Sequence, residues 1–179
     1  MHSRRIYLTR SAVLVAVGLI LPVVFHYISL GGQVFLPMHI PVLIGGFLLS
    51  PAYAATVGLV IPVLSSIFTG MPQMPFALIM MAELCTYGFV VSIVYRWYIK
   101  SIYAALIIGM IAGRAVSCIG NYVLYAFIAG KPFPFAAYLN TITLMALPGI
   151  AIQFLLIPAL ITLIQKYDEY ELNISNKAE

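Results

Sequence analysis

Long apolar runs separated by short polar or proline-rich breaks dominate the chain. A helix that crosses a bilayer needs about 20 mostly apolar residues. The region over residues 36–68 exceeds one such length and is divided at Ser50-Pro51, which predicts a short second span followed by a third. Proline and glycine mark the connections at residues 69–75 and 130–134. The pattern predicts transmembrane helices over residues 7–27, 37–49, 52–68, 76–95, 102–128 and 138–164.

These runs predict an all-α integral membrane protein that forms a single domain of six transmembrane helices over residues 1–179. Composition agrees, because 63% of the residues are apolar and 8% are charged, whereas soluble domains average about 25% charged residues. Residues 165–179 are polar and are expected to form a solvated tail. The basic residues are too few and too scattered to predict nucleic-acid binding.

The distribution of basic residues predicts the orientation in the membrane. Six spans place both termini on the same side, and cytoplasmic loops carry the excess of lysine and arginine. The side with the termini would carry Arg4, Arg5, Arg10, Arg96, Lys100, Lys166 and Lys177. The opposite side would carry only Lys131. We therefore expect both termini in the cytoplasm, and glycine-, proline- and methionine-rich loops outside.

Two opposite charges, Glu83 and Arg114, lie inside apolar segments. A charged side chain near the bilayer centre costs about 2.5–3.5 kcal/mol on insertion scales, so such residues usually face the bundle interior and mark a functional path or site. A structural ion pair that fixes the register of two helices is one interpretation. A ligand site open to the outside is the other. Proton conduction is disfavoured, because we identify no titratable relay in the cytoplasmic halves of these helices.

Helical spacing adds polar side chains near Glu83. Arg114 and Asn121 share one face of the fifth span, with Asn121 at about the depth of Glu83 and Arg114 deeper. Tyr87 lies one turn inward of Glu83 on the same face. These residues predict a cavity lined by a carboxylate, an amide, a phenol and a guanidinium.

The connections and the sixth span supply further candidates. His39 lies between prolines at the outer mouth of the second span, and Gln73 lies in the Gly70–Pro75 loop. Asn140 lies near the outer end of the sixth span, and Gln153 lies deeper in it. An interfacial histidine and a tight connection are the alternative interpretations of His39 and of the loop.

No catalytic motif, cofactor site or metal site is predicted. The chain has no Gly-x-Ser-x-Gly, His-Glu-x-x-His or phosphate-loop pattern, and Cys85 and Cys118 lie in apolar segments as small packing residues. A membrane-embedded enzyme would need Glu83, His39 and Arg114 to converge at hydrogen-bond distance. Their predicted depths argue against that convergence for His39 and Arg114.

Small residues on the first span predict a packing or docking face. Ala12 and Ala16 are four residues apart, and small-x-x-x-small patches let another helix approach closely. Internal packing is the simpler interpretation. A docking surface for a partner follows if the face points outward.

The chain resembles the substrate-binding (S) components of energy-coupling factor (ECF) transporters. The resemblance rests on Ala12-x-x-x-Ala16 and on the stretch from His39 to Gly58. That stretch looks like the family's Leu-x-Gly-Pro-x-x-Gly-Ala-x-Val-Gly turn between helices two and three. The six-span layout also fits, so the resemblance covers nearly the whole chain.

The resemblance implies a multi-pass subunit of a bacterial plasma membrane that captures a water-soluble vitamin in an outward-facing pocket. It would dock onto a membrane coupling (T) subunit driven by two ATPase subunits, which would hydrolyse the ATP. Ala12 and Ala16 would belong to the docking face. The pocket candidates would be Glu83, Tyr87, Asn121 and Asn140, with Gln73 and His39 in the lid loops. Arg114 would be the pocket floor or the counter-charge of Glu83.

Charge complementarity favours a small heterocyclic substrate. A buried carboxylate suits an amino or ring N–H donor, and a guanidinium suits an anionic or phenolic group. Hydroxymethylpyrimidine or a pyridoxine-like compound meets both demands, while pantothenate, folate and cobalamin stay open. A membrane assembly subunit without a ligand, in which Glu83 and Arg114 form a structural pair, is the main alternative.

Overall fold

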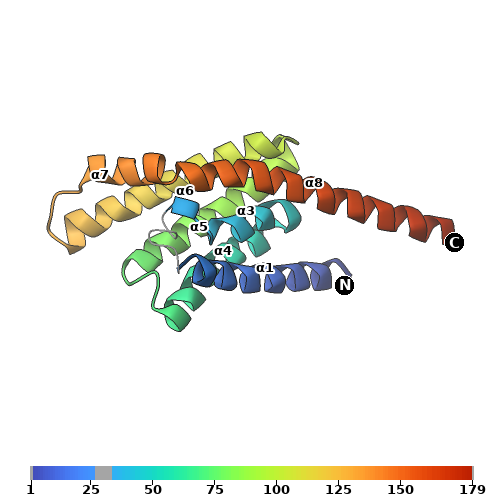
Figure 1. Ribbon diagram of the computed structural model, residues 1–179, viewed down its shortest axis with the longest axis horizontal. Coiled ribbons are helices and arrows are strands. Elements are labelled where there is room, and N and C mark those ends of the chain that lie inside the picture. Colours follow the sequence, from blue (N-terminus) through green and yellow to red (C-terminus); the bar gives the residue numbers. More distant parts are fainter. Residues whose placement is uncertain (1, 27–33, 179) are drawn as a thin grey trace.

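The computed structural model describes residues 2–26 and 34–178, with side chains for residues 4–25 and 34–170. All regular structure in these residues is helical, and Figure 1 shows the helices as one elongated bundle. The main helices are α1 (His2–His26), α3 (His39–Leu48), α4 (Pro51–Thr69), α5 (Phe76–Ile93), α6 (Ile102–Val123), α7 (Phe135–Asn140) and α8 (Leu147–Ala178). Three π-helical turns extend α5, α6 and α7, over Val94–Tyr98, Leu124–Ile128 and Thr141–Met145.

The chain is a multi-pass membrane protein, and five of its described helices are long and apolar enough to cross a bilayer. They cover Arg4–Phe25, Pro51–Thr69, Phe76–Tyr98, Ile102–Ile128 and Leu147–Tyr170. The predicted first, third, fourth and fifth spans correspond to the first four of these. The end of the first predicted span, residue 27, and the glycine-rich loop after it lie outside the described residues.

The predicted second span, residues 37–49, is not confirmed as a full crossing. Its helix, α3, has 10 residues, about 15 Å at 1.5 Å per residue, against a hydrocarbon core of about 30 Å. Leu36 has a φ of +50°, a left-handed conformation that cannot continue a right-handed helix. The helix therefore begins only at His39 and ends before Ser50-Pro51.

The predicted sixth span, residues 138–164, is displaced in the structure. A break at Ala146 separates the π-helical turn after α7 from α8, and the long apolar helix is Leu147–Tyr170. Proline at position 148 agrees with a new helix beginning here, because it has no N–H to continue the bonding of a preceding turn and is tolerated in a first helical turn. α8 continues to Ala178, so the predicted polar tail is a continuation of this helix through residue 178.

Two glycines bring α4 and α5 into backbone contact at the centre of the bundle. A Cβ atom at Gly58 would overlap the carbonyl group of Leu84, and one at Gly88 would overlap the carbonyl group of Ala54. Such close approach is possible only without side chains. The contact fixes α5, which also packs against α3 and α6, in the middle of the fold.

The two ends of the bundle differ. Figure 1 shows the N-terminus of α1 and the C-terminus of α8 at the same end, and the connections at residues 70–75 and 129–134 at the opposite end. Arg10 on α1 forms an ion pair with Asp168 on α8, at 3.0 Å between Nη2 and Oδ2. The terminal segments of the first and last helices thus lie together at one end of the bundle. Which end faces the cytoplasm stays a prediction.

Candidate functional site

The carboxylate of Glu83 is the centre of a buried polar cluster on α5. Glu83 is 4% exposed, and its Oε1 atom lies 3.1 Å from Nη1 of Arg114 on α6. The hydroxyl of Tyr87 donates a hydrogen bond to the same oxygen at 3.2 Å. Nε2 of His39 lies 3.6 Å from it, beyond ordinary hydrogen-bond length. The structure therefore brings three of the predicted site residues around Glu83.

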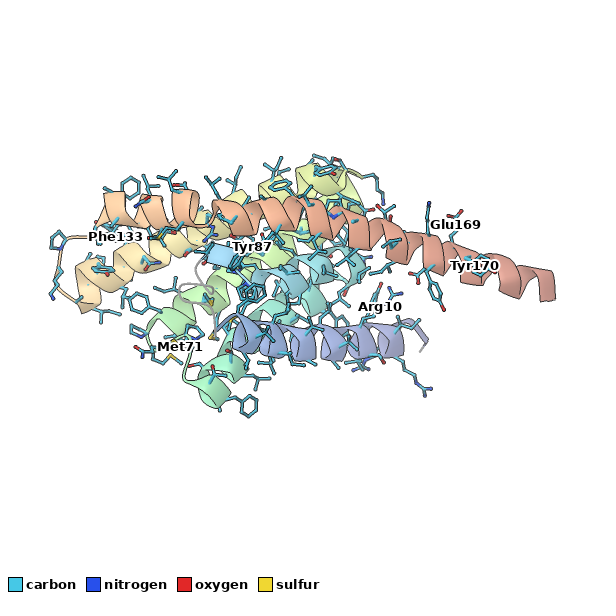
Figure 2. The ribbon with its side chains drawn as sticks, viewed as in Figure 1. Arg10, Met71, Tyr87, Phe133, Glu169 and Tyr170 are labelled. Carbon is cyan, nitrogen blue, oxygen red and sulfur yellow. The ribbon has the colours of Figure 1, made fainter. Side chains whose placement is uncertain are left out.

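Helix geometry explains how α5 and α6 build this cluster. Glu83 and Tyr87 are four residues apart, so they share one face of α5. Figure 2 shows Tyr87 in the interior of the bundle, between the helices. Gly113, next to Arg114, lies against the Tyr87 ring, and a Cβ atom there would be 2.8 Å from Cε1 of the tyrosine. The glycine thus lets α6 approach closely enough for Arg114 to reach Glu83.

The position of His39 corrects the prediction made from helix depth. The sequence places His39 in a lid loop and argues that Glu83, His39 and Arg114 do not converge. In the structure His39 is the first residue of α3, is 3% exposed, and packs its ring against Tyr87 with 5.3 Å between centroids. The depth argument was wrong because it assumed a full-length second span. The short α3 begins inside the bundle, at the level of Glu83.

The remaining predicted residues lie outside the cluster. The side-chain amide of Asn121 donates to the Ser117 carbonyl of its own helix at 2.8 Å. Asn140 and Gln73 are exposed. None of these three makes a described contact with Glu83, so a role in binding stays a prediction for each.

Tyr138 supports the cluster and was missed from the sequence. Its hydroxyl donates to the backbone carbonyl of Arg114 at 3.3 Å. Its ring lies 5.4 Å from that of Phe133, which Figure 2 shows at the loop end of the bundle. A tyrosine at the start of a predicted span is typical of a membrane interface, so the sequence carried no signal for this contact.

The cluster is suited to binding a polar molecule rather than a metal ion. The Ser117 side chain also hydrogen-bonds the Glu83 carboxylate, and a carboxylate accepts about four hydrogen bonds. Neither ring nitrogen of His39 has a hydrogen-bond partner among the described residues. In the same part of the chain, no group of three or more His, Cys, Asp or Glu side chains is placed to hold a metal. The two ring nitrogens of His39 are therefore the atoms of the cluster that are left for a ligand.

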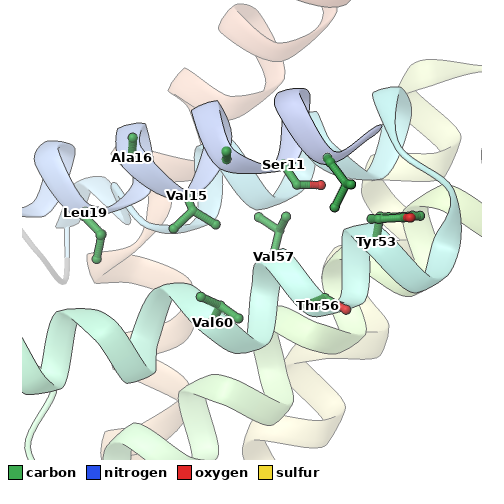
Figure 3. Close-up of a pocket in the computed structure, with 10 residues that line it drawn as sticks. Ser11, Val15, Ala16, Leu19, Tyr53, Thr56, Val57 and Val60 are labelled. Atoms are coloured by element: carbon green, nitrogen blue, oxygen red, sulfur yellow. The ribbon is translucent and has the colours of Figure 1, made fainter. Parts of the chain in front are cut away.

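Ala12 and Ala16 line an apolar groove on the other side of the bundle. The groove lies between α1 and α4 and has a volume of about 540 Å³. Figure 3 shows Val15 and Leu19 along its α1 side and Val57 and Val60 along its α4 side. Both alanines are exposed, so the small-residue face points out of the bundle rather than into it.

Comparison with known families identifies the kind of protein. A family model described as "ECF transporter, substrate-specific component" matches residues 6–161. The chain belongs to this family. It is thus the substrate-binding subunit of a transporter, and the partners of such an S component are membrane coupling and ATPase subunits. No curated protein and no solved structure matches the chain. The resemblance inferred from Ala12, Ala16 and the His39–Gly58 stretch is confirmed.

Proposed function

We propose that this S component captures a small heterocyclic vitamin or vitamin precursor, with Glu83 as the main recognition residue. The observation that carries the proposal is the buried imidazole beside the carboxylate: neither ring nitrogen of His39 has a hydrogen-bond partner among the described residues, and Nε2 lies 3.6 Å from Oε1 of Glu83. An ion pair with a purely structural role gives no reason for a buried imidazole beside it to stay without a partner. A substrate that bonds to the His39 ring and donates an N–H or O–H to the carboxylate would satisfy these buried groups.

Arg114, Tyr87 and His39 set the electrostatics of the proposed site. The guanidinium of Arg114 balances the charge of Glu83 at 3.1 Å, which lowers the cost of keeping a carboxylate inside the bundle. Tyr87 fixes the carboxylate orientation through its hydrogen bond, and its buried ring packs against His39. Hydroxymethylpyrimidine and pyridoxine present both ring-nitrogen acceptors and polar donors, so they fit this donor and acceptor set.

The substrate is proposed to enter at the loop end of the bundle and to be delivered when the protein docks onto its coupling subunit. Asn121, Asn140 and Gln73 are proposed to meet the substrate near the loop end, which would face the outside of a bacterial plasma membrane. The outward-pointing face of Ala12 and Ala16 is proposed to dock onto the coupling subunit, which two ATPase subunits drive. In this arrangement both termini lie in the cytoplasm.

The decisive experiment purifies the protein in detergent and identifies co-purifying small molecules by mass spectrometry. The proposal expects a bound heterocycle, and then saturable binding of hydroxymethylpyrimidine or pyridoxine by isothermal titration calorimetry. A different vitamin would keep the capture function and replace the substrate. Absence of any bound molecule, combined with a tight complex with a membrane partner, would contradict capture and favour an assembly subunit.

A further inference from the structure

Gln153 on α8 is a buried amide that the cluster around Glu83 does not use. The residue is 2% exposed, and its Nε2 atom has no hydrogen-bond partner among the described residues. A buried donor without an acceptor loses its hydration and gains nothing in return. Native proteins pair nearly all such groups, so each exception requires a specific explanation.

The neighbours of Gln153 on α8 place it beside the first turn of α3. Gly149, Gln153 and Ile157 are spaced by four residues and share one helical face. At one side of Gln153, Gly149 lies against the backbone of Val34 and Phe35. At the other side, Ile157 belongs to the buried core that contains Val42. α3 packs against α8, so the face of α8 that carries Gln153 lies along the beginning of α3.

His39 and Gln153 are thus two buried side chains with unsatisfied nitrogens on helices that pack together. Both nitrogens of the His39 ring and Nε2 of Gln153 are buried without hydrogen-bond partners in the described part of the chain. His39 is also the residue of the two that approaches Glu83, at 3.6 Å. A neutral or protonated imidazole and a primary amide both supply N–H donors. The ligand group that complements these N–H donors is a hydrogen-bond acceptor.

We propose that Gln153 is a substrate-recognition residue whose amide donates a hydrogen bond to a ring nitrogen or carbonyl oxygen of the molecule held by Glu83. This inference rests on the proposed function, and it narrows the substrate class. The substrate carries a donor for the carboxylate of Glu83 and an acceptor for Gln153. Helix-to-helix bonding is the alternative role for such an amide, but no described residue of a neighbouring helix accepts from Nε2.

The test compares three variants of the full chain in detergent. Gln153→Leu removes the amide with little change in volume, and Gln153→Glu keeps the shape but replaces the donor by an acceptor. Gln165→Leu is the matched control, since this exposed glutamine of the same helix already donates to the Tyr95 hydroxyl at 2.9 Å. Calorimetry measures the Kd of hydroxymethylpyrimidine and of pyridoxine. Mass spectrometry measures the amount of any co-purified small molecule, and thermal unfolding without added ligand measures stability.

We expect Gln153→Leu and Gln153→Glu to raise the Kd about tenfold and to reduce the co-purified molecule in proportion, with the control unchanged. Gln153→Leu should unfold at the wild-type temperature or above, because it removes an unpaired buried amide. Wild-type affinity in both Gln153 variants would overturn the inference and leave the proposed function intact. A lower unfolding temperature in Gln153→Leu with unchanged affinity would also overturn it, in favour of a packing role. A wild-type protein that carries no small molecule and binds neither probe would overturn both.

Discussion

At the scale of single residues, one carboxylate oxygen organises the interior. Arg114 and Tyr87 both bond to Oε1 of Glu83, and His39 approaches the same atom. Removing one partner of a buried pair leaves the other charge uncompensated, so both a structural and a binding role predict some loss of stability. A binding role also predicts a loss of substrate affinity, whereas a structural role predicts a loss of stability alone.

Glu83→Gln should weaken substrate binding about tenfold or more while leaving most of the protein folded. The substitution keeps the side-chain shape and one acceptor oxygen but removes the charge that a substrate donor would meet. Calorimetry gives the Kd, and size-exclusion chromatography gives the folded yield. The double variant Glu83→Gln/Arg114→Gln removes both charges and should recover folded yield without recovering binding. A binding role would be contradicted if affinity and folded yield fell equally in Glu83→Gln and both recovered equally in the double variant.

Residue chemistry in the sequence marked Glu83 and Arg114 as possible partners, but it left open whether they bind each other or a ligand and did not predict their surroundings. Glu83 and Arg114 could be paired because each is costly in lipid without the other. His39 was a candidate on chemistry, yet its place depends on where α3 begins, which the left-handed Leu36 determines. Asn140 and Gln73 are polar residues near predicted loops, and residue type alone does not distinguish a ligand contact from a solvated surface.

At the scale of helices, the contact between α4 and α5 holds the cluster in place. The backbone of each helix reaches the other because Gly58 and Gly88 have no side chain. Helix association in membranes depends on such packing, since lipid is as apolar as the helix surface. The stability of the site should therefore depend on these glycines, although neither contacts Glu83 in the cluster described above.

Gly88→Val should destabilise the folded protein by about 1–3 kcal/mol or more, because overpacking forces the two helices apart. Thermal unfolding in detergent would measure this loss. Ala82→Val is the matched control, since Ala82 is exposed on the same helix and the added atoms meet no neighbouring helix. Wild-type stability of Gly88→Val would show that α4 and α5 separate without cost.

Helix boundaries were harder to predict than helix existence. The apolar run over residues 138–164 contains Pro148, and the sequence pattern alone treated it as part of one span. In the structure this proline opens α8, so that the π-helical turn over Thr141–Met145 stays separate. The short α3 was also predicted as a span, because apolar length does not reveal a left-handed residue at the start.

At the scale of the whole molecule, the first and last helices meet at one end. Arg10 and Asp168 are joined by two hydrogen bonds at 3.0 and 3.2 Å, but their side chains are 33% and 47% exposed. Partly exposed ion pairs of this kind contribute about 0–1 kcal/mol. The pair marks where the termini lie more than it stabilises the fold.

A double-mutant cycle with Arg10→Gln and Asp168→Asn should give a coupling energy below about 1 kcal/mol. Unfolding temperatures measured at low and high salt would show the coupling decrease with ionic strength, because salt screens exposed charges. A coupling of several kcal/mol, insensitive to salt, would contradict this assignment and make the pair a main structural link.

The face of α1 should decide assembly rather than substrate binding. Only 11% of the residues in its apolar window are buried within the chain, and Ala16 lines the groove shown in Figure 3. Ala16→Trp should therefore abolish co-purification with the coupling subunit while the Kd for substrate stays at its wild-type value. Val13→Trp, on an exposed position outside the groove, is the control. Loss of substrate binding in Ala16→Trp would contradict the separation of the two surfaces.

The glycine contact between α4 and α5 also limits how the protein can change shape. Packed interfaces switch between discrete arrangements instead of deforming continuously, and a backbone-to-backbone contact offers no side chain whose rotamer could change. The carboxylate of Glu83 is therefore carried on a fixed two-helix frame. Any opening that admits a substrate must come from the groups brought to Glu83 by other helices: His39 on α3 and Arg114 on α6.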